Sequence, residues 1–413
     1  MQLPAAFEEL KRSWRTLAGA TIGVSGGIAA LVFYSFSVLT AELGTRYGWS
    51  RSQLGLAHMG YAFTLALALP VVGTIVDRRG ALRIIALSIA GETMVLLALA
   101  LAPAQVWLFI ALQIALAAAG AATTPLGYNR VISERFDRLR GFALACIVSG
   151  NGLCALLIPI VTSRLIQAYD WRAAYVALAG IAALLGTSGL LIVRSEQPLS
   201  ASADEAVEAA TKTVAVSLWP LLRRPLFWHL LAGFFIGTLG TSGYVPNMVR
   251  MLGELGLPTS RAAEVLGLTG LAVLCGRLGT GLLIDKLFAP WVLVASMVAT
   301  AAGLAGLAID GTAFAVPAAL LLGFTVGAEL DILPYLATRY FGVENVGKVY
   351  GALYASIIAA SGLSPAFIGI IADQFGSYRP ALWVSVGMLI PAIVIVATLP
   401  RYARPYATST LAA

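Results

Sequence analysis

The chain is divided into long apolar runs, each close to the length that a helix needs to cross a bilayer. A helix spans ~30 Å of hydrocarbon with about 20 apolar residues. Lipid offers no partner to backbone N–H and C=O groups, so runs of this length must be helical. The sequence therefore predicts an all-α membrane protein with twelve transmembrane helices, at roughly 18–43, 53–76, 81–102, 106–128, 141–166, 172–193, 227–250, 262–284, 290–309, 313–338, 348–372 and 379–399.

The composition excludes an ordinary water-soluble enzyme. Of the 413 residues, 59% are hydrophobic and 11% are charged, whereas soluble domains carry about 25% charged residues. The three cysteines fall in apolar runs, which is typical of neither a disulfide framework nor a metal cluster. The sequence contains no phosphate-binding Gly-x-x-x-x-Gly-Lys motif and only two histidines. We therefore expect no enzymatic activity, no cofactor and no metal.

The positive charge sets the expected orientation. The 27 lysines and arginines give a net charge of +7, but they form short clusters between apolar runs, not the basic stripe of a nucleic-acid-binding protein. Most of them lie on the side that carries both termini, which the positive-inside rule makes cytoplasmic. We expect a multi-pass, monomeric protein of the plasma (inner) membrane with both termini in the cytoplasm.

The longest polar stretch separates six apolar runs from six more. This Ala-, Ser- and Glu-rich segment, 194–226, predicts a flexible cytoplasmic linker between an N-terminal bundle, 1–193, and a C-terminal bundle, 227–413. Repeated six-helix units are the usual build of secondary transporters, whose sites lie near the membrane midplane between the repeats.

A short motif closes the second run and is partly repeated after the eighth. It consists of Gly73, Asp77 and Arg78 in the first half, and Asp285 takes the place of Asp77 in the second. The motif resembles the cytoplasmic loop motif of the major facilitator superfamily. The resemblance implies two pseudo-symmetric six-helix bundles and a gating role for Asp77, Arg78 and Asp285.

Two further stretches narrow the resemblance. Trp49 and Arg51 before the second run, and residues 135–143 entering the fifth, are similar to the monocarboxylate transporters and the bacterial oxalate/formate exchangers. The resemblance implies alternating-access transport of a small organic anion and an arginine in the eighth run that binds the carboxylate. Ile357 stands where oxalate exchangers place a lysine, so the second cationic site for a dicarboxylate is missing.

Arg277 is the arginine of the eighth run, and physical reasoning alone also singles it out. A guanidinium at mid-membrane costs ~2.5–3.5 kcal/mol on insertion scales, so it needs a partner or a water-filled cavity. It precedes Asp285 by eight residues, ~12 Å of helix, which is too deep to snorkel easily. Its fork of donors suits a planar carboxylate. The alternative is a purely structural ion pair.

Two acids of the tenth run, Glu329 and Asp331, are the candidate partners of Arg277. They lie ~200° apart around a helix, so they cannot both point at it. Our hypothesis is that one of them neutralises Arg277 in the empty carrier, and that an arriving substrate carboxylate displaces it. The freed acid then takes up a proton, so that anion and proton cross together. The alternative is that both acids only balance charge and set the packing.

Polar side chains on other cavity-lining runs are further candidate substrate ligands. Each is by itself as compatible with packing as with binding. Tyr34 and Tyr354 rank first because they resemble aromatic positions of the oxalate exchangers. The full set is Tyr34, Tyr61, Tyr128, Asn129, Asn151, Tyr244, Asn247, Tyr335 and Tyr354. Glu92, in the third run, is interpreted as a structural acid that is protonated or hydrogen-bonded.

The function that the sequence predicts is proton-coupled symport of a small organic monocarboxylate, aliphatic or aromatic. The expected partners are the anion, protons and the lipid bilayer. The alternatives are a proton-coupled drug or metabolite exporter, an anion exchanger and, last, a receptor that senses its ligand without transporting it.

Overall fold

All regular elements that the structure describes are helices. The computed structural model describes residues 3–136, 139–196, 223–284, 286–342 and 346–402. The N-terminal group contains α1 (Leu3–Ser25), α2 (Leu31–Tyr47), α3 (Arg51–Arg79), α4 (Ala81–Leu101), α5 (Val106–Gly120), the 3-10 helix η1 (Ala121–Thr123), α6 (Pro125–Arg135), α7 (Arg140–Ala168) and α8 (Trp171–Ser195). The C-terminal group contains α11 (Pro225–Thr241), α12 (Tyr244–Glu254), α13 (Thr259–Ile284), α14 (Ala289–Asp310), the 3-10 helix η3 (Gly311–Phe314), α15 (Ala315–Phe341), α16 (Val346–Phe375) and α17 (Arg379–Ala397).

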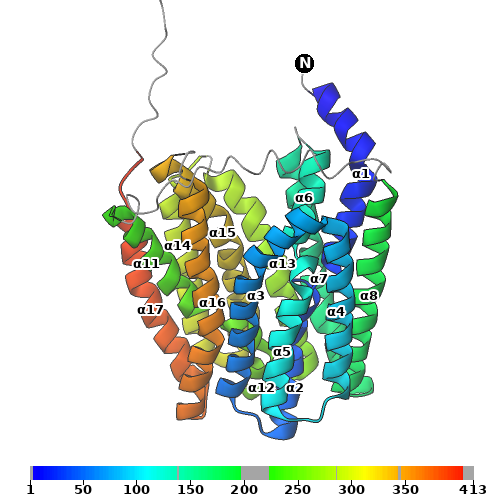
Figure 1. The fold of residues 1–413 in the computed structure, drawn as a ribbon. Coiled ribbons are helices and arrows are strands. Elements are labelled where there is room, and N and C mark those ends of the chain that lie inside the picture. The colour runs from blue at the N-terminus through cyan, green and yellow to red at the C-terminus, as the bar shows by residue number, and fades with distance from the viewer. Residues whose placement is uncertain (1–2, 137–138, 197–222, 285, 343–345, 403–413) are drawn as a thin grey trace, which may run out of the picture.

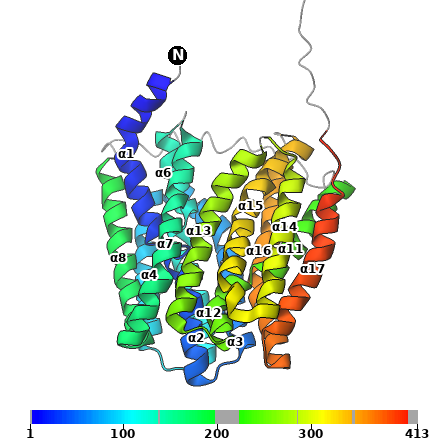
Figure 2. The ribbon, with the colours of Figure 1, turned by 180° about the vertical axis from the view of Figure 1, so that it is seen from behind.

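The two groups of helices stand side by side, as Figures 1 and 2 show from opposite sides. We call the face that carries the N-terminus the upper face, and the face that carries the turn between α2 and α3 the lower face (Figure 1). One hydrophobic core lies in the C-terminal group and takes in Val38 and Ala41 of α2. Two smaller cores lie entirely in the N-terminal group. Most of the predicted linker, 197–222, lies outside the described residues.

Large apolar side chains cover the outside of the molecule. Leu101 is 82% exposed, Leu67 74% and Leu282 72%, a surface that water does not tolerate over this extent but lipid does. Ten segments of the described chain are long and apolar enough to cross a membrane. One of them, Ala289–Phe341, contains both α14 and α15, and the α1–α2 run is not among them. The count is therefore consistent with the twelve predicted crossings.

The predicted runs match the observed helices closely, except that three of them are not continuous. The prediction of one helix over 227–250 was wrong, because Ser242 and Gly243 separate α11 from α12. The other two interrupted runs lie in the N-terminal group. The prediction of one helix over 18–43 was wrong, because the chain unwinds at 26–30 between α1 and α2. The prediction over 106–128 was wrong in the same way, because η1 and Thr124 separate α5 from α6. Pro125, at the first turn of α6, has no N–H with which to continue the preceding helix. Gly27 lets the two breaks touch, since a Cβ there would lie 2.3 Å from the carbonyl oxygen of Thr123.

A network of charged groups joins the two groups of helices at the lower face. Arg51, at the start of α3, donates from Nη2 to Glu254 Oε2 over 2.7 Å and from Nη1 to Asp373 Oδ1 over 3.2 Å. Asp373 also accepts the backbone N–H of Arg51 over 3.1 Å, at the positive end of α3. Beside them, Arg250 donates to the carbonyl oxygen of Trp49 over 3.1 Å. These contacts link the two groups of helices at the lower face.

The close backbone contacts between the two groups also lie from mid-membrane to the lower face. A Cβ on Gly55 of α3 would lie 2.5 Å from the Cα of Ala366 on α16, and one on Gly267 of α13 would lie 2.8 Å from the carbonyl oxygen of Leu156 on α7. Towards the upper face, a Cβ on Gly73 of α3 or on Gly281 of α13 would have no neighbour within 4 Å. The packing is thus tight at the lower face and looser towards the upper one.

Candidate functional site

The packing of α13 against α15 brings Arg277 and Asp331 together. The two helices run in the same direction and cross closely at Gly327, where an added Cβ would lie 2.2 Å from the carbonyl oxygen of Val273 and 3.0 Å from the backbone nitrogen of Arg277. Arg277 follows Val273 by one helical turn, and Asp331 follows Gly327 by one turn. The same register therefore brings Arg277 near Asp331, and the charge of Arg277 acts on Asp331.

Three tyrosines from two other helices complete the cluster around Arg277. The charge of Arg277 acts on Tyr34 of α2, and on Tyr350 and Tyr354 of α16. The rings of Tyr350 and Tyr354 are stacked, with centroids 5.5 Å apart and planes 16° from parallel. The cluster thus draws α2 from the N-terminal group and α13, α15 and α16 from the C-terminal group. We call these five residues, Arg277, Asp331, Tyr34, Tyr350 and Tyr354, the arginine cluster.

Arg277 is neither turned away from the protein nor clamped by an acid. Its side chain is partly buried, as is that of Asp331. Within the described residues no ion pair joins the two, although they interact electrostatically. The guanidinium therefore keeps donors for a ligand, while the nearby carboxylate balances its charge. Phenol hydroxyls can donate further hydrogen bonds to an anion, and the stacked rings offer an apolar wall.

Glu329 lies apart from the arginine cluster. Its side chain is 5% exposed and accepts a hydrogen bond from the hydroxyl of Thr238 on α11. The ~200° that separates Glu329 from Asp331 around α15 explains why one acid meets α13 and the other meets α11. The structure thus separates two acids that the sequence left equivalent.

Two predicted tyrosines lie elsewhere in the N-terminal group. Tyr61 donates from its hydroxyl to the carbonyl oxygen of Ile28 over 3.3 Å. Tyr128 is fully buried, and its hydroxyl has no hydrogen-bond partner in the part of the chain that the structure describes. Both interact electrostatically with Glu92, not with Arg277.

Neither Asn151 nor Tyr335 belongs to the arginine cluster. Asn151 precedes Cys154 by one turn of α7, Cys154 interacts with Tyr34, and the Asn151 Oδ1 atom is buried without a partner. Tyr335 accepts a hydrogen bond from Arg339 Nε over 3.2 Å near the upper end of α15. The candidate on α6, Asn129, is partly buried.

The predicted gating residues stay a prediction. Arg78 is exposed at the end of α3. Asp285 and the side chain of Asp77 lie outside the described part of the chain.

Sequence reasoning missed Tyr350 and the network at the lower face. Tyr350 precedes Tyr354 by four residues, a spacing that places both on one face of a helix. That spacing was a usable signal. The charged network at the lower face could not be predicted, because Glu254 and Asp373 lie 203 and 322 residues from Arg51 in the sequence.

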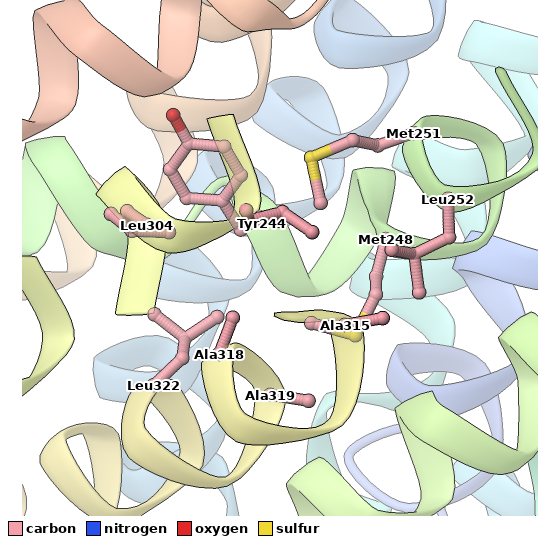
Figure 3. Close-up of a pocket in the computed structure, with 10 residues that line it drawn as sticks. Tyr244, Met248, Met251, Leu252, Leu304, Ala315, Ala318, Ala319 and Leu322 are labelled. Atoms are coloured by element: carbon pink, nitrogen blue, oxygen red, sulfur yellow. The ribbon is translucent and has the colours of Figure 1, made fainter. Parts of the chain in front are cut away.

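A small apolar cavity lies apart from the arginine cluster. It sits between α12, α14 and α15, and Figure 3 shows side chains such as Tyr244, Met248 and Leu322 around it. Its room of about 10 Å³ holds one water molecule at most. This cavity therefore does not compete as a substrate site.

Comparison with known proteins assigns the fold to a family. The sequence profile described as Major Facilitator Superfamily matches residues 22–328 and 280–412. The chain belongs to the Major Facilitator Superfamily. Membership agrees with the predicted fold and with a transporter that is not an enzyme. Solved structures agree with it as well: a bacterial homologue of the human lysosomal transporter Spinster, in an inward-facing and occupied conformation, matches with a TM-score of 0.72 at 15% identity, over 94% of this chain and 96% of that one.

Among curated proteins, this superfamily member is similar to a bacterial transporter and to animal monocarboxylate transporters. The uncharacterized MFS-type transporter YhjX of Escherichia coli is 24% identical over 83% of this chain and 84% of its own length. Monocarboxylate transporter 13 of Bos taurus is 27% identical over 66% of this chain and 62% of its own length. Monocarboxylate transporter 11 of Mus musculus is 25% identical over 65% and 62%.

Proposed function

We propose that this superfamily member is a secondary active transporter of a small organic monocarboxylate, working by proton symport and alternating access. The observation that carries the proposal is Arg277, an intramembrane guanidinium with no ion pair in the described chain, held among Asp331 and three tyrosines. The animal relatives named as monocarboxylate transporters support the substrate class.

The coupling step follows from charge balance in the arginine cluster. In the empty carrier Asp331 offsets the charge of Arg277. A substrate carboxylate then binds the guanidinium in place of Asp331. Asp331, now without its cation, takes up a proton because an isolated carboxylate in a low-dielectric site is strongly disfavoured. The loaded cluster then holds one anion, one cation and one neutral acid, so the halves can rock without a net buried charge.

Orientation and location belong to the same proposal. The upper face, which carries the N-terminus, is cytoplasmic, and the protein lies in the plasma (inner) membrane as a monomer. The basic residues of the upper loops support this orientation. In that orientation the network at the lower face closes the outer side of the carrier.

The test is a thermal-shift panel of aliphatic and aromatic monocarboxylates on the purified protein, followed by uptake of the best stabilising acid into proteoliposomes. We expect Arg277→Ala to lower the affinity for the acid, as derived from the thermal shifts, by about tenfold or more, since a hydrogen bond to a charged group is worth ~1.5–3 kcal/mol. Arg277→Lys should recover only part of it, because lysine lacks the planar fork.

A matched control lies on the same helix. Arg261, near the start of α13, forms an exposed ion pair with Glu264 at 2.8 Å, and Arg261→Ala should leave both readouts unchanged. An acid whose effect survives Arg277→Ala would place the anion site elsewhere. Uptake that needs a counter-anion inside the vesicles, and no proton gradient, would instead favour anion exchange.

A further inference from the structure

The two interrupted helices of the N-terminal half meet at a buried acid. The chain between α1 and α2 contacts η1 through a hydrogen bond from the N–H of Ile28 to the Thr123 hydroxyl, over 3.1 Å. The same hydroxyl lies 2.8 Å from Oε2 of Glu92 on α4 and 2.7 Å from the carbonyl oxygen of Gly120. Its single proton can go to only one of them, and when it goes to the carbonyl oxygen, a protonated Glu92 donates to the hydroxyl. Glu92 thus lies next to Thr123, where the breaks in α1–α2 and α5–α6 touch.

Glu92 has no visible compensation for a negative charge. The residue is 1% exposed, and its Oε1 atom is buried without a hydrogen-bond partner among the described residues. In the described residues no lysine, arginine or histidine pairs with it. An ionised carboxylate in that position lacks a donor on one oxygen and a counter-charge altogether, and burying such a charge is far more costly than burying the neutral acid.

The groups that face Glu92 from the helices around α4 do not change this balance. Tyr61 on α3 and Tyr128 on α6 interact electrostatically with Glu92. The hydroxyl of Tyr61 is engaged with a backbone carbonyl, and that of Tyr128 is unpartnered. His58 on α3 packs against aromatic rings, 6.2 Å from the ring of Tyr61. On α8, Tyr175 accepts a hydrogen bond from another side chain.

We propose that Glu92 is a second proton-binding site of the carrier. It lies where the two interrupted N-terminal helices meet, at the contact between residues 26–30 and Thr123, which we call the junction. The proton sits on the carboxyl group while the junction is closed. Helix α6 begins two residues after Thr123, and its positive end favours the ionised form once water enters. The proton is therefore exchangeable, and its release goes with opening of the junction.

The junction also connects to the arginine cluster through the chain. Tyr34 lies in the first turn of α2, directly after the break that Thr123 holds. Loss of the proton from Glu92 would move the start of α2 and with it Tyr34. The site thus adds a second coupled proton to the proposed symport, in the half of the molecule that Arg277 and Asp331 do not occupy.

The test measures protonated carboxylic acids directly in the reconstituted full-length protein. Infrared difference spectra between acidic and alkaline pH report the carbonyl stretch of each acid that titrates. We expect Glu92→Gln to remove one component, and Thr123→Val to shift the frequency of that component because the acid loses its hydrogen bond. Glu42→Gln, which breaks an ion pair with Arg46 at the edge of α2, is the matched control and should remove none of the buried-acid components.

An unchanged difference spectrum in Glu92→Gln would overturn the proposal, because it would show that Glu92 does not titrate. Loss of the wild-type component on adding sodium would assign the site to a metal cation and would overturn it too. Should Glu92→Gln not fold, Glu92→Asp replaces it, and the component should then shift, not vanish. Arg277→Ala should keep this component. The proposal for Glu92 and the proposal that Arg277 binds the substrate carboxylate can therefore fail independently of each other.

Discussion

At the scale of single residues, the environment of each acid decides its chemistry more than its place in the sequence does. Glu329 and Asp331 are neighbours on α15, yet one is buried against Thr238 and the other meets Arg277. Glu92, which the sequence analysis interprets as a structural acid, has one carboxyl oxygen that is buried without a hydrogen-bond partner in the described residues. An intramembrane acid is therefore assigned by what faces it.

The first residue-scale prediction separates the two acids of α15. We expect Asp331→Asn to abolish the coupling of proton uptake to substrate uptake, because an amide cannot take the proton that displacement by substrate requires. Glu329→Gln should keep coupling, since its partner Thr238 can donate to an amide oxygen as well. Proton and substrate fluxes measured together in proteoliposomes check both variants. Coupling that survives in Asp331→Asn and disappears in Glu329→Gln would reverse the assignment.

At the scale of elements, glycine at the crossing of α13 and α15 sets the position of Arg277. A Cβ on Gly276 would lie 2.3 Å from the carbonyl oxygen of Phe324, and one on Gly323 would lie 2.3 Å from that of Thr269. Backbone atoms cannot move aside as a flexible side chain can. The close approach of the two helices thus depends on small residues, as is common between helices in membranes.

This packing predicts a contrast between two glycines of one helix. Gly276→Ala should destabilise the protein by ~1–3 kcal/mol through overpacking. Gly281→Ala, five residues on, points into open space and should be neutral or slightly stabilising, because glycine costs about 0.5–1 kcal/mol in a helix relative to alanine. Thermal unfolding of the two purified variants provides the comparison. Equal melting temperatures would mean that the crossing tolerates a wider separation.

At the scale of the whole molecule, charged groups from both halves meet at the lower face. Arg51 is central, since it contacts Glu254 and Asp373 of the C-terminal half from the start of α3, and its guanidinium lies 5.3 Å from the ring centre of Tyr378. Burial raises the pKa of Tyr378, which lies in the turn before α17, so the ring stays neutral beside these charges. An alternating carrier must break this network to expose the arginine cluster on that side.

We therefore predict that Arg51→Ala shifts the resting population towards states open at the lower face. Spin labels at Tyr169 and Phe375, both exposed near that face and one in each half, should report longer distances in a background without the native cysteines. Asp373→Asn should act in the same direction, and Arg261→Ala, which breaks only a local exposed pair, should not. A distance distribution that is identical in Arg51→Ala and in the parent would show that packing alone keeps the face closed.

The sequence by itself determined the helical class, the approximate bounds of the helices and the presence of Arg277 within one of them. Those features follow from local physics. In lipid, every long apolar run must form its backbone hydrogen bonds within itself, and an arginine in such a run is rare because its charge is costly there. Only the tertiary structure decided that Asp331 rather than Glu329 meets Arg277, that Tyr350 joins Tyr354 beside it, and that two predicted helices are interrupted where Glu92 lies. These depend on which faces of distant helices meet, and the contacts that fix them join residues that no local pattern connects.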